Sequence, residues 1–281
     1  MSEPVHKFAH DAMATTFEIF LATEDKDYAA STAQQAWALL DTLEDKLSRF
    51  RPHSDISILN LLEPGESVRL SIEAFDCLKL AFELSTETGG AFDVSLATIM
   101  DEIRNEKGEV HLADPDLLDA AFAEKRKGLY LLSIEDLTVY CQEPGSGIDL
   151  GGIGKGFALD QLAEFLQDWD LPRSLLHSGG STVLALDPPE AAQGWKVGFG
   201  DETGREPLWL TREAMSGSGK AMKGAHVLDP RTARPAETES RTWARAPTAA
   251  QADALSTAFM VLSPEEVDVY CREHPGVTAY L

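Results

Sequence analysis

Hydrophobic side chains recur every three or four positions in several parts of the chain, a spacing that predicts amphipathic helices. One such helix is expected over residues 31–48, with apolar positions at Ala33, Trp37, Leu40, Leu43 and Leu47. A second is expected over 72–86, closed by Gly89 and Gly90, because glycine readily takes the left-handed conformation that ends helices. A third is predicted over 116–125, after a proline.

Short runs rich in β-branched and aromatic residues predict strands between these helices. Residues 129–140 resemble a hairpin turning at Glu135 and Asp136. Further strands are expected at 174–176, 183–186, 196–199 and 208–211. Their close spacing favours antiparallel pairing. The next polar stretch, Ser216-Gly217-Ser218-Gly219, is expected to be a loop.

The last third of the chain carries helix start signals. Thr248, with Gln251 three residues later, matches a capping box and predicts a helix through Leu262. Ser263 and Glu266 repeat the signal for a final helix. The predicted fold class is therefore α+β, with antiparallel sheets and interspersed helices. Because no repeat or low-complexity linker marks a boundary, residues 1–281 are expected to form a single domain.

Charge and composition narrow the function classes. Asp and Glu outnumber Lys and Arg by 47 to 24, a formal charge of −23, so nucleic acid is an unexpected partner. No apolar run approaches the roughly 20 residues that cross a bilayer. Residues 1–10 contain no signal-peptide core, so a cytoplasmic protein without a membrane span is expected. Cys77, Cys141 and Cys271 lack paired spacing, which favours free thiols over disulfides or a zinc cluster.

A glycine-rich turn, Gly151 to Gly156, precedes a helix with apolar residues from Phe157 to Trp169. Glycines allow a ligand to approach the backbone, and a helix N-terminus with Lys155 attracts anions. The spacing fits neither a Walker A loop nor the dinucleotide fingerprint. A tight strand-to-helix turn without a ligand explains these residues equally well.

Three other segments contain candidate chemistry. Asp253 and Thr257 are four residues apart and share a helix face, where a carboxylate and a hydroxyl suit Mg²⁺, although solvated side chains are the commoner case. His226 begins a short apolar strand before Asp229, and imidazole exchanges protons near neutral pH. Phe92, in the segment 88–93, has a ring that could stack on a planar ligand or pack in the core.

These segments, taken in order, resemble the signature blocks of the FAD:protein FMN transferase (ApbE) family. The resemblance covers about residues 13 to 262. Its blocks are Met13 to Phe17, Leu47 to Asn60, Thr88 to Asp93 (Thr-Gly-Gly-Ala-Phe-Asp), Asp149 to Asp160, Ser178 to Gly180, His226 to Pro235 and Ala252 to Ala258. It implies a two-lobed domain of the flavin transferase type.

The resemblance also implies functional residues. Magnesium would be held by Asp253, Thr257 and the backbone carbonyl of Gly152. The FAD site would be lined by Met13, Phe50, Ala91, Phe92, Asp93, Asp149, Lys155 and Ala236. Lys155, His226 and Asp229 are the catalytic candidates: Lys155 would neutralise phosphate charge, and either of the other two could deprotonate the acceptor hydroxyl.

The implied reaction transfers FMN from FAD to a threonine or serine of an acceptor protein and releases AMP. Two alternatives stay open. Water could replace the acceptor, giving an FAD pyrophosphatase that produces FMN and AMP, or the chain could bind FAD without cleaving it. Phe50, Ser181 and Ala233 depart from the family pattern, which often has Tyr, Asn and Gly at these places.

Overall fold

The computed structural model describes residues 3–103, 120, 122–123, 129–143, 145, 147–199, 206–219, 228–232, 234–236 and 241–281. Seven antiparallel strands form its main sheet, in the order β1-β2-β6-β7-β10-β13-β14. They are β1 (Val5–Ala12), β2 (Thr15–Ala22), β6 (Ser174–Ser178), β7 (Thr182–Ala185), β10 (Glu213–Ser218), β13 (Thr242–Ala246) and β14 (Thr278–Tyr280). The mixed helical and antiparallel fold confirms the predicted class.

Three helices cover one face of this sheet and bury the main core: α1 (Lys26–Leu47), α6 (Gly154–Asp168) and α8 (Ala249–Ala258). The opposite face carries a second apolar cluster beneath the hairpin of β8 (Trp195–Val197) and β9 (Leu208–Leu210). Apolar side chains therefore alternate along the strands, pointing to one cluster and then the other.

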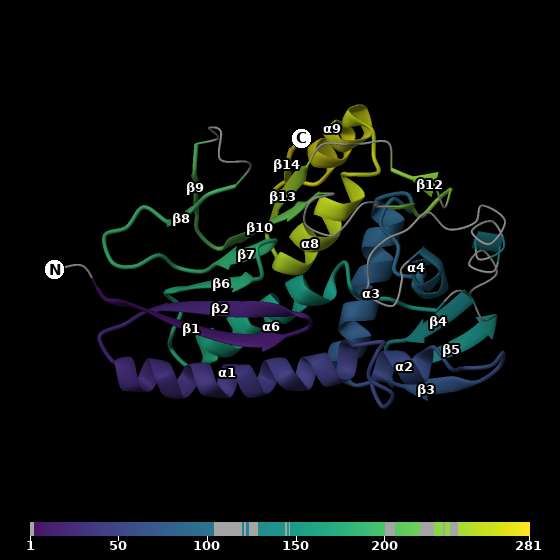
Figure 1. The fold of residues 1–281 in the computed structure, drawn as a ribbon, viewed down its shortest axis with the longest axis horizontal. Helices are drawn as coiled ribbons and strands as arrows, with labels where there is room; N and C mark the ends of the chain where they lie inside the picture. Colours follow the sequence, from purple (N-terminus) through teal and green to yellow (C-terminus); the bar gives the residue numbers. More distant parts are fainter. Residues whose placement is uncertain are drawn as a thin grey trace.

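A smaller lobe lies at the end of the molecule away from the β8–β9 hairpin (Figure 1). Its three-stranded sheet has the order β3-β5-β4. The lobe comprises β3 (Ser67–Arg69), β4 (Leu129–Ser133), β5 (Thr138–Glu143), α2 (Asp55–Leu59), α3 (Ile72–Glu87) and α4 (Ala97–Ile103). Two remaining short strands, β11 (Leu228–Asp229) and β12 (Arg234–Pro235), pair with each other, and α9 (Pro264–Glu273) precedes β14.

Several local predictions are confirmed. The helix expected over 31–48 begins earlier, at Lys26, because the side chain of Asp25 accepts the backbone N–H of Tyr28 and caps it. Helix α3 ends before Gly89 and Gly90, whose φ values of 58° and 79° are left-handed. Ser263 and Glu266 form the expected capping box. The hairpin near Glu135 and the four short strands are also present.

Other predictions fail or fall outside the described residues. Helix α8 ends at Ala258 rather than Leu262. The capping box at its start is incomplete, because Thr248 Oγ1 accepts the N–H of Gln251 while Gln251 Oε1 has no hydrogen-bond partner among the described residues. The helix expected over 116–125 lies almost wholly outside the described residues.

The segment 216–219 was predicted to be a loop, and this prediction is wrong. Glu213–Ser218 is strand β10, which lies between β7 and β13 in the main sheet. Its serines and glycine are typical of an exposed loop, so the sequence pattern did not indicate a buried strand. Within the described part of the chain, no helix combines the length and apolar character needed to cross a bilayer. Cys77 and Cys141 are buried free thiols, and Cys271 is half-buried.

Candidate active site

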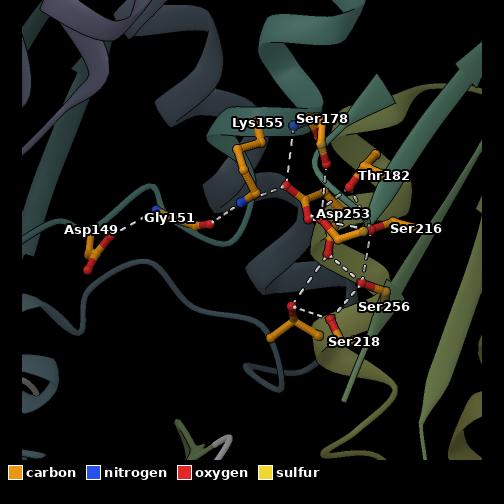
Figure 2. Close-up of polar contacts among 12 residues, drawn as sticks. Asp149, Gly151, Lys155, Ser178, Thr182, Ser216, Ser218, Asp253 and Ser256 are labelled. Atoms are coloured by element: carbon orange, nitrogen blue, oxygen red, sulfur yellow. Dashed lines mark hydrogen bonds and ion pairs between the residues drawn. The ribbon is translucent and has the colours of Figure 1, made fainter. Parts of the chain in front are cut away.

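The glycine-rich turn before α6 is held by its own side chains (Figure 2). Asp149 Oδ1 accepts the backbone N–H of Gly151 at 2.8 Å. Lys155 Nζ donates to the carbonyl oxygen of the same Gly151 at 2.9 Å. The carboxylate of Asp149 therefore holds the N–H of Gly151, and the ammonium group of Lys155 holds its carbonyl group.

Lys155 also links this turn to helix α8. Its Nζ lies 3.7 Å from Asp253 Oδ2, and the backbone N–H of Gly156 donates to the same oxygen at 3.2 Å. Asp253 is only 1% exposed. Since a buried carboxylate is costly without an opposite charge, Lys155 and the N-terminus of α6 together stabilise it. A chain of polar contacts thus runs from Asp149 through Gly151 and Lys155 to Asp253.

Helices α6 and α8 are in direct backbone contact. A Cβ atom on Gly156 would lie 2.2 Å from the carbonyl oxygen of Ala249, so only glycine fits there. One turn further along α6, the carboxylate of Asp160 accepts the backbone N–H groups of Ala249 and Ala250 at 2.7 and 2.8 Å. Burial raises the pKa of Asp160 to about 7, although these two N–H donors oppose the shift. Asp160 therefore caps two further backbone N–H groups in the first turn of α8.

Strands β7 and β10 present hydroxyl groups to helix α8, which carries Asp253. Ser216 Oγ and Thr182 Oγ1 share a hydrogen bond of 2.9 Å, and both oxygens lie 3.5 Å from Asp253 Oδ1. Ser218 Oγ lies 2.9 Å from Ser256 Oγ and 3.3 Å from Thr257 Oγ1. The strand that was mistaken for a loop therefore forms one wall around the predicted metal ligands.

The donors around Asp253 suit a hard cation. Its carboxylate is buried, yet its polar contacts among the described residues are 3.2 Å or longer, and those of Thr257 Oγ1 are 3.3 and 3.4 Å. Gly152 lies in the same glycine-rich turn as Lys155 and Gly156, which contact this carboxylate. Among the described residues no group of three His, Cys, Asp or Glu side chains could hold a metal. One carboxylate supported by neutral oxygens is compatible with Mg²⁺, which keeps waters and substrate phosphates as further ligands.

A cavity of about 390 Å³ lies beside the glycine-rich turn. It brings together four of the residues expected at the FAD site: Met13, Phe50, Asp149 and Lys155. Three cationic side chains and two carboxylates line it, and each of the cations is paired with at least one carboxylate. The charged lining residues are Glu44, Arg49, Arg51, Asp149 and Lys155. The guanidinium and ammonium groups of the lining are nevertheless donors of the kind that bind phosphate oxygens.

The segment 88–93 lies behind the turn rather than in the cavity lining. Ala91 and Phe92 are buried, and a Cβ on Gly152 would lie 3.2 Å from the ring of Phe92. Asp93 Oδ1 accepts the backbone N–H of Ser95. The next residue, Val94, accepts the backbone N–H of Asp149 at 2.7 Å, which joins this segment to the turn.

Two remaining candidates, Asp229 and Ala236, lie in β11 and directly after β12. Asp229 Oδ2 lies 2.9 Å from the guanidinium of Arg231, so this carboxylate is paired. Arg231 packs against Gly90, because a Cβ there would lie 3.6 Å from Arg231 Cγ. Ala236 follows β12 and is half-buried. His226 lies outside the described residues.

Sequence reasoning did not assign a role to several residues of this region. Arg49 is one, although it stands in the recognised block before Phe50. Asp160 is another, since nothing in its sequence context indicates contact with α8. The hydroxyls of Thr182, Ser216 and Ser218 are the third group. Residues 213–218 show no strict alternation of apolar and polar positions, so no local signal indicated a strand there.

Comparison with known proteins places this arrangement in a family. The model of the ApbE family matches residues 13–281. A protein of Klebsiella pneumoniae (strain 342) named FAD:protein FMN transferase is 25% identical over 287 residues, covering 96% of this chain and 81% of its own. A protein of the same name from Treponema pallidum (strain Nichols) is 28% identical over 275 residues, covering 88% and 75%.

Solved structures share the fold. The apo form of the Pseudomonas stutzeri flavinyl transferase ApbE superposes with a TM-score of 0.83 at 22% identity, covering 99% of this chain and 92% of that one. An ApbE protein from Thermotoga maritima gives 0.84 at 22% identity, covering 98% and 93%. The chain belongs to the ApbE family, which confirms the recognition made from the ordered motifs.

Proposed function

We propose that this protein transfers FMN from FAD to a threonine or serine hydroxyl of an acceptor protein and releases AMP. The observation that carries the proposal is the contact of Lys155 with both Gly151 and Asp253 beside the cavity. It joins a cavity lined by three cationic side chains to a buried carboxylate suited to a hard cation. Family membership and the transferase names of the relatives support the same reaction.

In this reaction the acceptor oxygen forms a bond to the phosphorus of the FMN half. The bond from that phosphorus to the bridging oxygen breaks, and AMP leaves with the electron pair. Lys155 would hold the phosphates and offset their negative charge, while the apolar and aromatic lining orients the rings. The hydroxyl proton must pass to a base, for which His226 and Asp229 are the candidates.

Asp253, Thr257 and the carbonyl of Gly152 would hold Mg²⁺. When bound, the ion supplies charge neutralisation at the pyrophosphate oxygens. The chain's own contribution is to hold the carboxylate of Asp253 in one position. Lys155, Gly156 and the hydroxyls of Thr182 and Ser216 contact its carboxylate from several sides.

The decisive experiment incubates purified protein with FAD, with and without Mg²⁺, and follows AMP and FMN. An acceptor protein or peptide with a threonine is then added, and covalent flavin is detected by in-gel fluorescence and mass spectrometry. Magnesium-dependent AMP release with flavin on the acceptor would support the transferase. AMP with free FMN in the absence of acceptor would favour the pyrophosphatase, and binding without cleavage would favour a non-catalytic protein.

A further inference from the structure

Arg49 is a nearly buried cation at the edge of the cavity. Its side chain is 9% exposed, although it lies in the short connection between α1 and α2. Its guanidinium reaches two distant segments: Nε donates to Asp149 Oδ2 at 2.9 Å, and the terminal nitrogens donate to both oxygens of Asp101 at 3.0 and 2.7 Å. One side chain therefore connects the end of α1, the glycine-rich turn and helix α4.

The contact with Asp149 reaches the part of the turn that Lys155 also holds. Asp149 Oδ2 is bound by Arg49, while Oδ1 accepts the N–H of Gly151. Both carboxylate oxygens are thus engaged, which fixes the orientation of the group. Gly151 is hydrogen-bonded to both Asp149 and Lys155. A displacement of Asp149 would therefore move Gly151 and with it Lys155.

Arg49 also contacts the aromatic wall of the cavity. Its guanidinium carbon lies 4.3 Å from the centroid of the Phe50 ring, a cation–π geometry. Phe50 is 70% exposed, and so the buried core does little to fix its ring. The planar guanidinium covers one face of the Phe50 ring, so a ligand would stack on the other face.

We propose that Arg49 is a positioning residue of the FAD site, which holds Phe50 and Asp149 in a fixed relationship across the cavity. The inference rests on the proposed function, because it assumes that the cavity takes FAD. Lysine cannot replace arginine here, since a single ammonium group cannot engage two carboxylates through a planar fork and lie flat on a ring at the same time.

The test compares Arg49→Lys and Asp101→Asn with the wild type. FAD affinity is measured by flavin fluorescence, and the KM for FAD and kcat are measured from AMP release. Arg49→Lys is expected to weaken FAD binding and raise KM about tenfold, with kcat at saturating FAD and the Mg²⁺ requirement within about twofold of wild type. Asp101 is 60% exposed, so Asp101→Asn should fold normally and weaken FAD binding about threefold.

Arg245→Lys is the matched control. Arg245 makes a comparable two-pronged pair with Glu213, at 2.6 and 2.7 Å, but it lies on β13 outside the cavity lining. It should alter the melting temperature without altering FAD affinity. A merely structural role for Arg49 would give the same result as this control.

Unchanged FAD affinity in both Arg49→Lys and Asp101→Asn, together with a lowered melting temperature, would overturn the proposal. Wild-type protein that binds FAD but releases no AMP would overturn the proposed function alone, because the affinity comparison would still decide the role of Arg49. Wild-type protein that does not bind FAD would overturn both.

Discussion

The backbone N–H of Gly156 donates to Asp253 Oδ2 across 3.2 Å, so the first turn of α6 directly contacts the helix that carries the predicted metal ligands. This contact requires two backbones to approach closely, which the missing side chain of Gly156 permits. The site therefore depends on how the helices pack as much as on the polar side chains themselves.

Gly156→Ala is expected to separate α6 from α8. Its Cβ would lie 2.2 Å from the carbonyl oxygen of Ala249, so a backbone shift should cost about 1–3 kcal/mol of unfolding free energy. Magnesium-dependent turnover should fall as well. Gly198→Ala is the matched control, because nothing lies within 4 Å of its added Cβ. Urea denaturation of both variants checks the prediction, and equal losses would contradict it.

Asp253→Asn tests the cation site. Removing the charge should lower magnesium-dependent AMP release at least about a hundredfold, because the remaining donors are neutral oxygens. The fold should persist, since a buried charge is replaced by a neutral group of the same shape. Thr257→Ser keeps its hydroxyl and should retain most activity. Comparable activity in Asp253→Asn and wild type over a magnesium titration would refute the assignment.

Lys155→Met leaves the buried carboxylate of Asp253 without its opposite charge. We expect a loss of about 1–3 kcal/mol in unfolding free energy. The double variant Lys155→Met/Asp253→Asn should recover part of this loss, because no unpaired charge remains. Excess Mg²⁺ should raise the melting temperature of Lys155→Met more than that of the double variant. If the double variant loses as much unfolding free energy as the two single variants together, the side chains are not coupled.

Asp160 predicts a pH-dependent stability. Burial raises its pKa from 3.8 to about 7, so the folded chain binds this proton more tightly than the unfolded chain. The resulting stabilisation is complete below about pH 4 and is lost as the pH rises through about 7. The stability of wild type relative to Asp160→Asn should therefore fall over this range. Urea midpoints of both proteins at several pH values measure this difference in stability. A wild type that becomes more stable relative to Asp160→Asn as the pH rises would contradict the prediction.

The β1–β2 turn offers a stabilising substitution. Met13 and Ala14 have φ values of 50° and 58°, in the left-handed region that favours glycine. Ala14→Gly should raise the unfolding free energy by about 0.5–1 kcal/mol. Ala9→Gly, within strand β1, should lower it by a similar amount. Thermal unfolding measures both, and a destabilised Ala14→Gly variant would show that the turn is relaxed with alanine.

The sequence predicted those parts of the fold in which local pattern and tertiary environment agree. Helices α1 and α3 bury a regular apolar stripe, so periodicity located most of α1, and glycine signals placed the end of α3. Strand β10 was not predicted, because its buried face carries serines that form hydrogen bonds with partners distant in sequence. No local pattern records such partners.

The candidate site was predicted to a similar extent. Ordered motifs pointed to Asp149, Lys155 and Asp253, which the structure joins through one chain of contacts. Arg49 and Asp160 were missed, because their roles depend on contacts spanning 100 and 89 residues of sequence. Spacing along the chain contains no information on such distances.

The alternation along β10 has a consequence for how the protein reaches its working form. Ser216 and Ser218 face α8, whereas Gly217 faces the ring of Trp243, which leaves no room for a Cβ. A slip of one residue in pairing would turn the serines away from Asp253 and bring Met215 and Gly217 towards it. A sheet paired one residue out of register would therefore lack the polar wall, so the site requires correct pairing of β10 with its neighbours.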